Sequence, residues 1–192
     1  MHQATELRPG PPASNQNALE LALLTRIAAQ DAQAMHELYH LYHRRLARFL
    51  MRLTSRYDLA EEIINDTFWV VWQHAADFRG ASKVSTWIFG IGYRRALKTL
   101  KRVRPDLMVE ESEAPEQVYE PWLHAELREW LGVALDKLPH EQRAVLELAY
   151  HVGHSCEEIA TIMQCPVNTV KTRMFHARRK LKGLLNSLSG AL

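Results

Sequence analysis

Cysteine, long apolar runs and a secretory leader are scarce or missing in this chain of 192 residues. Its two cysteines are too few for the disulfide framework of a small secreted domain. The N-terminal stretch holds three prolines and no apolar run that resembles a signal sequence. No segment approaches the roughly 20 apolar residues that cross a membrane as a helix. These absences predict a cytoplasmic protein that does not insert directly into a membrane.

A catalytic or metal-binding constellation is also missing. His36, His40 and His43 share one expected helix, but no nucleophile, acid pair or glycine-rich phosphate loop accompanies them. His36 and His40 could together hold a metal, although an ordinary exposed helix face explains them better. A second group has spacings that fit no common zinc pattern: His151, His154, Cys156 and Cys165. We therefore expect neither an enzyme nor a bound metal or cofactor.

The net charge of +2 hides strong local blocks of opposite sign. Residues 94–104 carry six basic side chains and no acid, whereas residues 105–121 carry six acids and no base. Prolines and like-charge repulsion disfavour packing of the acidic block, which predicts a flexible linker. Such alternation indicates two basic modules for nucleic acid on either side of an acidic tether.

Helical periodicity dominates on both sides of this linker, and strand-like alternation is rare. The sequence predicts an all-α protein made of two small helical domains. We expect a disordered tail over 1–17, a first domain over 18–104, the linker over 105–121 and a second domain over 122–192. The expected helices span 18–30, 32–54, 58–76, 84–103, 122–136, 140–151, 155–164 and 168–187.

The end of the second domain has the pattern of a helix-turn-helix. Ser155 and Glu158 form an S-x-x-E capping box at a helix start, and Pro166 then prevents that helix from continuing. The next helix has one apolar stripe at steps of four and three, made of Val170, Met174, Ala177, Leu181 and Leu184. Its segment 171–182 has six Lys or Arg and no acid. A basic second helix of this kind enters the major groove of DNA.

The first domain combines acidic, aromatic and basic stretches in order. Residues 58–72 read DLAEEIINDTFWVVW, an amphipathic helix whose acids can face a partner or only solvent. A polar loop bracketed by Phe78 and Trp87 follows, and the next helix becomes steadily more basic towards Arg104. Single-stranded DNA binding needs aromatics for base stacking and cations for phosphates. Taken alone, Trp87 and Phe89 are more typical of a core.

The order of these parts resembles the extracytoplasmic-function (ECF) class of bacterial sigma factors, in the sigma-70 family. Residues 58–72 are similar to the region 2 helix that docks on core RNA polymerase. FRG at 78–80 through STWI at 85–88 is similar to the loop and helix that open and read the minus-ten element. LPHEQRAVLEL at 138–148, EIA at 158–160 and NTVKTR at 168–173 resemble region 4, which reads the minus-thirty-five element. The resemblance implies a factor that directs core polymerase to promoters and promotes their melting.

The resemblance also implies which residues meet each partner. Polymerase binding falls to Glu61, Glu62, Asn65 and Asp66. Contact with the minus-ten element, as duplex and as melted nontemplate strand, falls to Arg79, Ser82, Lys83, Trp87, Arg94, Arg95, Lys98 and Arg102. Contact with the minus-thirty-five element falls to Asn168, Thr169, Lys171, Thr172, Phe175, His176, Arg178 and Arg179. Arg94 and Lys98 stand where the family usually has Asn and Asp, so the promoter sequence stays open.

Regulation and an alternative function stay open from the sequence. The class is typically held inactive by an anti-sigma factor, often membrane-anchored, and we expect a helical inhibitor between residues 20–103 and 122–187. Control by abundance alone is the other possibility. A helix-turn-helix regulator that does not bind core polymerase would explain residues 138–187. It would leave the basic, aromatic-rich first domain unexplained.

Overall fold

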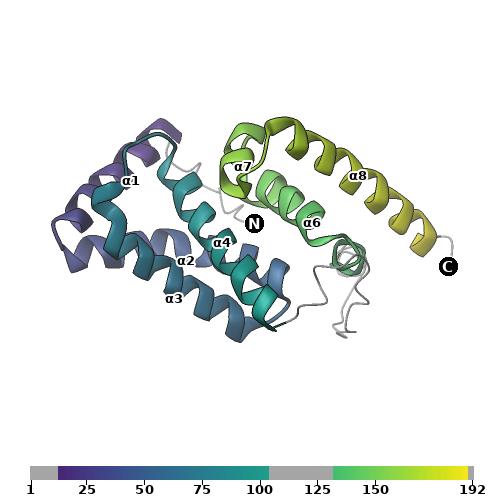
Figure 1. Cartoon of the computed structure of the whole chain (residues 1–192), viewed down its shortest axis with the longest axis horizontal. Coiled ribbons are helices and arrows are strands. Elements are labelled where there is room, and N and C mark those ends of the chain that lie inside the picture. The colour runs from purple at the N-terminus through teal and green to yellow at the C-terminus, as the bar shows by residue number, and fades with distance from the viewer. Residues whose placement is uncertain (1–12, 104–131, 190–192) are drawn as a thin grey trace, which may run out of the picture.

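The computed structural model describes residues 13–103 and 132–189, which are almost entirely helical (Figure 1). The expected linker over 105–121 lies outside the described residues, and so does the expected tail as far as residue 12. Helix α1 (Ala13–Ala28) begins five residues earlier than the predicted domain boundary at 18. In its first turns, Gln16 Nε2 donates a hydrogen bond of 3.0 Å to Glu20 Oε1. The two residues are four positions apart, a separation at which side chains on a helix meet and stabilise it.

Four helices and one short 3₁₀ turn form a first unit, residues 13–103. After α1 come α2 (Ala32–Thr54), α3 (Tyr57–His74), the turn η1 (Ala75–Asp77) and α4 (Val84–Val103). Asp31 caps α2 by accepting from the amides of Gln33 and Ala34, and α2 ends at Ser55, which has a left-handed φ of 53°. The predicted helices at 32–54 and 84–103 therefore match the observed ones.

The core of the first unit is built from one stripe on each helix. Leu38, Tyr42, Leu46 and Phe49 are buried along α2, at helical spacing. The stripe expected on α3 is buried as predicted: Ala60, Ile64, Phe68 and Val71, followed by Ala75 in η1. The acids on the other side of α3 are left at the surface as a direct consequence.

A second unit, residues 132–189, contains the helix-turn-helix. Residues 132–136 are helical and are followed by α6 (His140–Leu146), the π-helical turn η3 (Glu147–Val152), α7 (Cys156–Met163) and α8 (Val167–Ser189). The predicted capping box is present, with the Glu158 amide 3.3 Å from Ser155 Oγ and the Ser155 amide 2.9 Å from Glu158 Oε2. Gln164 then turns the chain with a left-handed φ of 52°.

The two units pack directly against each other. Helix α7 lies on α4, and the C-terminal part of α2 contacts α6 and η3 (Figure 1). The Arg143 guanidinium donates to the Arg52 carbonyl oxygen at 3.0 Å, which joins α6 to α2. Rings also meet across the boundary: Phe89 with His154 at 5.3 Å between centroids, and Tyr93 with His140 at 6.3 Å. Side chains of the second unit thus complete the surface of the first.

Candidate polymerase and nucleic-acid interfaces

Helix α3 presents the acidic face on which polymerase binding was predicted. Glu62, Asn65 and Asp66 are exposed, and Glu61 is half-buried. The structure pairs these acids within the first unit. His43 Nε2 lies 3.3 Å from Glu61 Oε2, Arg102 Nη2 lies 3.1 Å from Glu62 Oε1, and Arg95 Nη1 lies 3.8 Å from Asp66 Oδ2. Groups that the sequence assigned to two different partners are therefore also partners of each other.

An apolar hollow borders this acidic face, and the sequence reasoning missed it. Ala32, Met35, Asn65, Phe68, Trp69 and Trp72 line the hollow between α2 and α3. Trp69 is 60% exposed. Leaving so large an apolar side chain in water is unfavourable, so its exposure indicates that it has a role. The signal was in the sequence, because Trp69 lies off the buried stripe of α3. The hollow thus places exposed apolar surface directly beside the acidic face.

The loop before α4 holds the first of the predicted minus-ten residues. Arg79 is exposed beside Gly80, whose φ of 70° makes the turn, and Ser82 is half-buried. Lys83 Nζ lies 2.7 Å from Glu158 Oε1 in the second unit. Trp87 packs on Phe78 with ring centroids 5.1 Å apart and keeps part of its surface accessible. This loop thus offers cations and one partly open aromatic ring.

Phe89 does not belong to this surface. The sequence left it as either a stacking residue or a core residue, and it is fully buried beside Tyr42 and Phe49. A buried ring cannot stack on a base without unfolding its surroundings, which leaves Trp87 with Phe78 as the aromatic side of the predicted site.

The basic part of α4 faces outward next to α3. Arg94, Arg95 and Lys98 line a shallow hollow together with Val70 and Ile91. Burial lowers the pKa of Arg94, whose guanidinium lies against the α4 backbone near Gly90. Arg102, one turn beyond Lys98, is exposed and paired with Glu62. The structure therefore gathers four of the predicted minus-ten cations on one helix.

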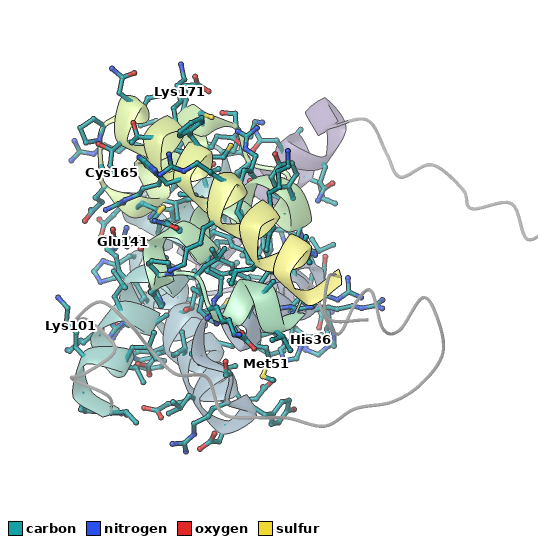
Figure 2. All side chains as sticks on the ribbon, turned by 90° about the vertical axis from the view of Figure 1, so that its right-hand side faces the viewer. His36, Met51, Lys101, Glu141, Cys165 and Lys171 are labelled. Carbon is teal, nitrogen blue, oxygen red and sulfur yellow. The ribbon has the colours of Figure 1, made fainter. Side chains whose placement is uncertain are left out.

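Helix α8 buries its apolar stripe and turns its cations outward. Val170, Met174 and Ala177 are buried against α6 and α7, whereas Leu181 and Leu184, farther along the predicted stripe, are only half-buried. The other predicted contact residues lie off this stripe: Asn168, Lys171, Thr172, Phe175, His176, Arg178 and Arg179 are exposed, and Thr169 is half-buried. Lys171 lies at the outer surface near the start of α8 (Figure 2). The arrangement leaves the predicted recognition face exposed, as contact with a groove of duplex DNA requires.

Two details organise this recognition face. Phe175 is 59% exposed, and the Arg179 guanidinium carbon lies 5.9 Å from its ring centroid. Such a cation–π contact holds the arginine over a ring that could touch a thymine methyl group. Arg173 is turned the other way and forms an ion pair with Glu141 of α6. It therefore fixes α8 on α6 and is not part of the recognition face.

Metal ligands do not converge in the part of the chain that the structure describes, where no group of three or more His, Cys, Asp or Glu side chains is placed to hold an ion. His36 and His40 are exposed neighbours with Nε2 atoms 3.0 Å apart.

Within the described helices, none is long and apolar enough to cross a bilayer.

The fold and these surfaces define a class: a two-unit helical protein with a DNA-binding helix-turn-helix. Comparison with known proteins places it further. Residues 38–105 match the family described as Sigma-70 region 2, and residues 128–181 match Sigma-70, region 4. The ECF RNA polymerase sigma factor SigL of Mycobacterium tuberculosis is 30% identical over 173 residues, covering 88% of this chain and 98% of that protein. The chain therefore belongs to the ECF sigma factors of the sigma-70 family.

Other similar proteins agree. The ECF RNA polymerase sigma-E factor of Haemophilus influenzae is 29% identical, covering 87% of this chain and 95% of that protein. The solved structure of the sigma factor RpoE in complex with the anti-sigma factor NepR, from Bartonella quintana, has a TM-score of 0.63 at 26% identity, with 79% of this chain and 96% of that chain covered. CnrH, solved with the cytosolic domain of CnrY, shares the fold at a TM-score of 0.68 and 24% identity, with 88% of this chain and 98% of that chain covered.

Proposed function

We propose that this ECF sigma factor binds core RNA polymerase, directs it to specific promoters and promotes their melting, without catalysing a reaction itself. The observation that carries the proposal is the outward cationic face of α8, which is backed by a buried apolar stripe and joined in one chain to the acidic and aromatic surfaces of α3 and α4. A regulator that only binds DNA would not need those further surfaces. Its place of work is the cytoplasm, where polymerase and promoters are.

Polymerase docks on α3 in this proposal. Glu61, Glu62, Asn65 and Asp66 supply charge and hydrogen bonds to a basic surface of the polymerase, and the exposed Trp69 supplies apolar contact beside them. The partners of Glu62 and Asp66 within the chain are exposed surface pairs, which contribute little to stability. A polymerase surface can therefore replace them at low cost.

The loop 79–86 and α4 take the minus-ten element. An unpaired base of the nontemplate strand would be held at the loop rim, with Trp87 as a partly open ring and Lys83 as the basic neighbour. Arg94, Arg95, Lys98 and Arg102 follow along α4 and would hold the phosphates.

The α8 face takes the minus-thirty-five element. Lys171 and Arg179 can contact guanine or phosphate, Thr172 either type of base, and Phe175 a thymine methyl group. Asn168, Thr169, His176 and Arg178 flank these residues and would fix the position of the helix on the backbone.

An anti-sigma factor is a further proposed partner. Two solved relatives carry a second chain in their complexes, and in one of them that chain is an anti-sigma factor. An inhibitor inserted between residues 20–103 and 122–187 would have to displace α7 from α4, because the two units are in direct contact here. Binding that spans both units from outside would leave this contact in place.

Run-off transcription tests the proposal. Core polymerase is combined with the purified chain and a fragment library from the native genome, and transcripts are mapped. We expect promoter-specific initiation that depends on the chain and is lost with Lys171→Ala plus Thr172→Ala. Lys137→Ala, at an exposed cation outside α8, is the matched control. Sequence-specific DNA binding without any polymerase-dependent initiation would favour the plain helix-turn-helix regulator instead.

A further inference from the structure

Two exposed histidines on α2 face each other across one turn of the helix. The Nε2 atoms of His36 and His40 are 3.0 Å apart, and the two rings meet edge to face with centroids 4.3 Å apart. Residues four apart on a helix are neighbours, which explains the close approach. Neither ring has a carboxylate partner among the residues that the structure describes. The two imidazole nitrogens therefore converge on each other and stay open to solvent.

The other histidines in the described part of the chain are engaged differently. Four of them lie within 3.3 Å of a carboxylate oxygen: His43, His74, His151 and His154. His140 is stacked on Tyr93, and His176 lies beside the ring of Phe175. Among the described residues, His36 and His40 are thus the pair in which two imidazole nitrogens meet.

Helix α2 holds this pair in a fixed position. Leu38 and Tyr42 lie on the opposite side of the helix and are fully buried, so α2 cannot turn in its place. The ring of Tyr39 meets His40 at 6.0 Å and packs on the core ring of Phe68 at 4.8 Å. Side chains on a packed helix are positioned more precisely than side chains on a loop. A ligand that needs both imidazoles would therefore require little reordering of the backbone.

The distance between the two nitrogens fits two ligands of one metal ion. Two metal–imidazole bonds of about 2.1 Å that meet at a right angle place their nitrogens about 3.0 Å apart, whereas the tetrahedral angle typical of Zn²⁺ places them about 3.4 Å apart. Adjacent positions at a right angle belong to square-planar and tetragonal coordination, which Cu²⁺ and Ni²⁺ prefer. Rotation of the two exposed rings can direct both nitrogen lone pairs at one ion on the solvent side.

We propose that His36 and His40 form a surface binding site for a divalent transition metal of the Ni²⁺ or Cu²⁺ class, with water in the remaining coordination positions. The site uses none of the residues of the proposed function and does not depend on it. Of the charges nearby, Glu37 is paired with Arg26 at 3.6 Å, and the exposed Arg44 lies one turn beyond His40 and can extend into solvent. Mg²⁺ and Ca²⁺ prefer oxygen ligands and are not expected to bind.

Titration of the full chain with Ni²⁺, followed by NMR of the histidine ring signals, tests the site. Ni²⁺ is paramagnetic and broadens the signals of the rings that it binds, and it spares the two free cysteines, which Cu²⁺ can oxidise. We expect His36 and His40 to broaden together, ahead of the exposed His74 and His176. Binding should weaken from pH 7.5 to pH 5.5, because a metal needs neutral imidazoles. Broadening of His36 and His40 no earlier than of His74 and His176 would overturn the proposal.

Two variants separate chelation from a general affinity of histidine for metals. His36→Gln removes one ligand, so the Ni²⁺ affinity reported by the His40 signal should fall at least tenfold, because the second bond is no longer intramolecular. His40→Gln with Leu41→His keeps ten histidines but moves one to an exposed position five residues from His36, on a different side of the helix. We expect this spacing variant to bind as weakly as His36→Gln. Equal affinity of the wild type and the spacing variant would refute the site.

Chemical denaturation gives a readout that does not depend on ring signals. A ligand that binds the folded chain stabilises it by mass action, so Ni²⁺ at ten times its Kd should lower the unfolding equilibrium constant of the wild type about tenfold. The spacing variant should show no such change, and Mg²⁺ should have no effect on either protein. A Ni²⁺ effect of equal size in the spacing variant would assign the stabilisation to other groups and contradict the proposal.

Discussion

Helices α4 and α8 are both strongly basic, yet they present their charge in different ways. On α4, Arg95 and Arg102 are paired with acids of α3, and the inner face of the helix is covered by α7. On α8, Arg173 is the one cation with an ion pair among the described residues, and it faces inward. Similar composition thus gives a surface with internal competitors on α4 and an open surface on α8. Charge alone therefore does not say which DNA element the free chain can bind.

The largest effect is expected at the proposed polymerase-binding face of α3. Reversing Glu61 and Glu62 to Lys should weaken core binding about a hundredfold, because truncating or reversing charges in an interface leaves partner charges unpaired. Gln73→Lys, which adds charge at another exposed position of α3, is the control. Affinity is measured by titration of labelled core enzyme, and circular dichroism checks the fold. Unchanged core binding would remove α3 from the interface.

The next largest effect is expected at the exposed basic surface of α8. Lys171→Ala with Thr172→Ala should weaken binding to upstream duplex by about 10- to 100-fold, since a base-edge contact contributes roughly 1–3 kcal/mol. Sequence preference should change with affinity, whereas the loss of phosphate contacts would weaken all sequences alike. A promoter-library selection reads out both. Identical preferences for the wild type and the double variant would refute the assignment.

A smaller effect is expected on the competed surface of α4. Arg94→Ala with Lys98→Ala should reduce open-complex formation by about tenfold and flatten its salt dependence by roughly 1.4 in log–log slope, if each cation holds one phosphate of a single strand. Arg48→Ala, an exposed cation on α2, is the control. If the permanganate footprint and its salt slope both stay as in the wild type, these cations do not hold the melted strand.

The smallest expected effect is a pH dependence of stability. It arises at His140, where the second unit contacts α4. Burial, aided by Arg143 on the same helix, lowers the pKa of His140 to about 4, and from α4 the ring of Tyr93 stacks on it. The unfolded chain therefore binds a proton between pH 6.5 and 4 that the folded chain does not, so stability falls as pH falls through this window. We expect a loss of about 1 kcal/mol between pH 7.5 and pH 5.5.

Chemical denaturation at several pH values measures this loss. His140→Phe keeps a ring against Tyr93 without a titrating group and should flatten the dependence between pH 7.5 and pH 5.5. His176→Phe, at an exposed histidine of α8, is the control and should leave it in place. An equally steep dependence in both variants would assign the effect to other groups.

The sequence alone was enough to predict the features that depend on residues close together along the chain. The capping box at Ser155, the turn after α7 and the stripe from Val170 to Ala177 on α8 depend on residues three or four positions apart, and all were predicted correctly. The start of α1 at Ala13 was missed, since helix ends depend on weak local preferences. The expected face of α3 was also correct, because a period of 3.6 residues separates the buried side from the exposed side.

Only the tertiary structure decided what those faces meet. The pairing of Glu62 with Arg102 joins positions 40 apart, and the pairing of Lys83 with Glu158 joins the two units. The burial of Phe89 beneath His154 has the same origin. Nothing in the local sequence encodes such pairs, because each depends on the angle at which whole helices pack. The sequence thus determined the helices and their surfaces, and packing determined which of those surfaces the folded chain leaves open.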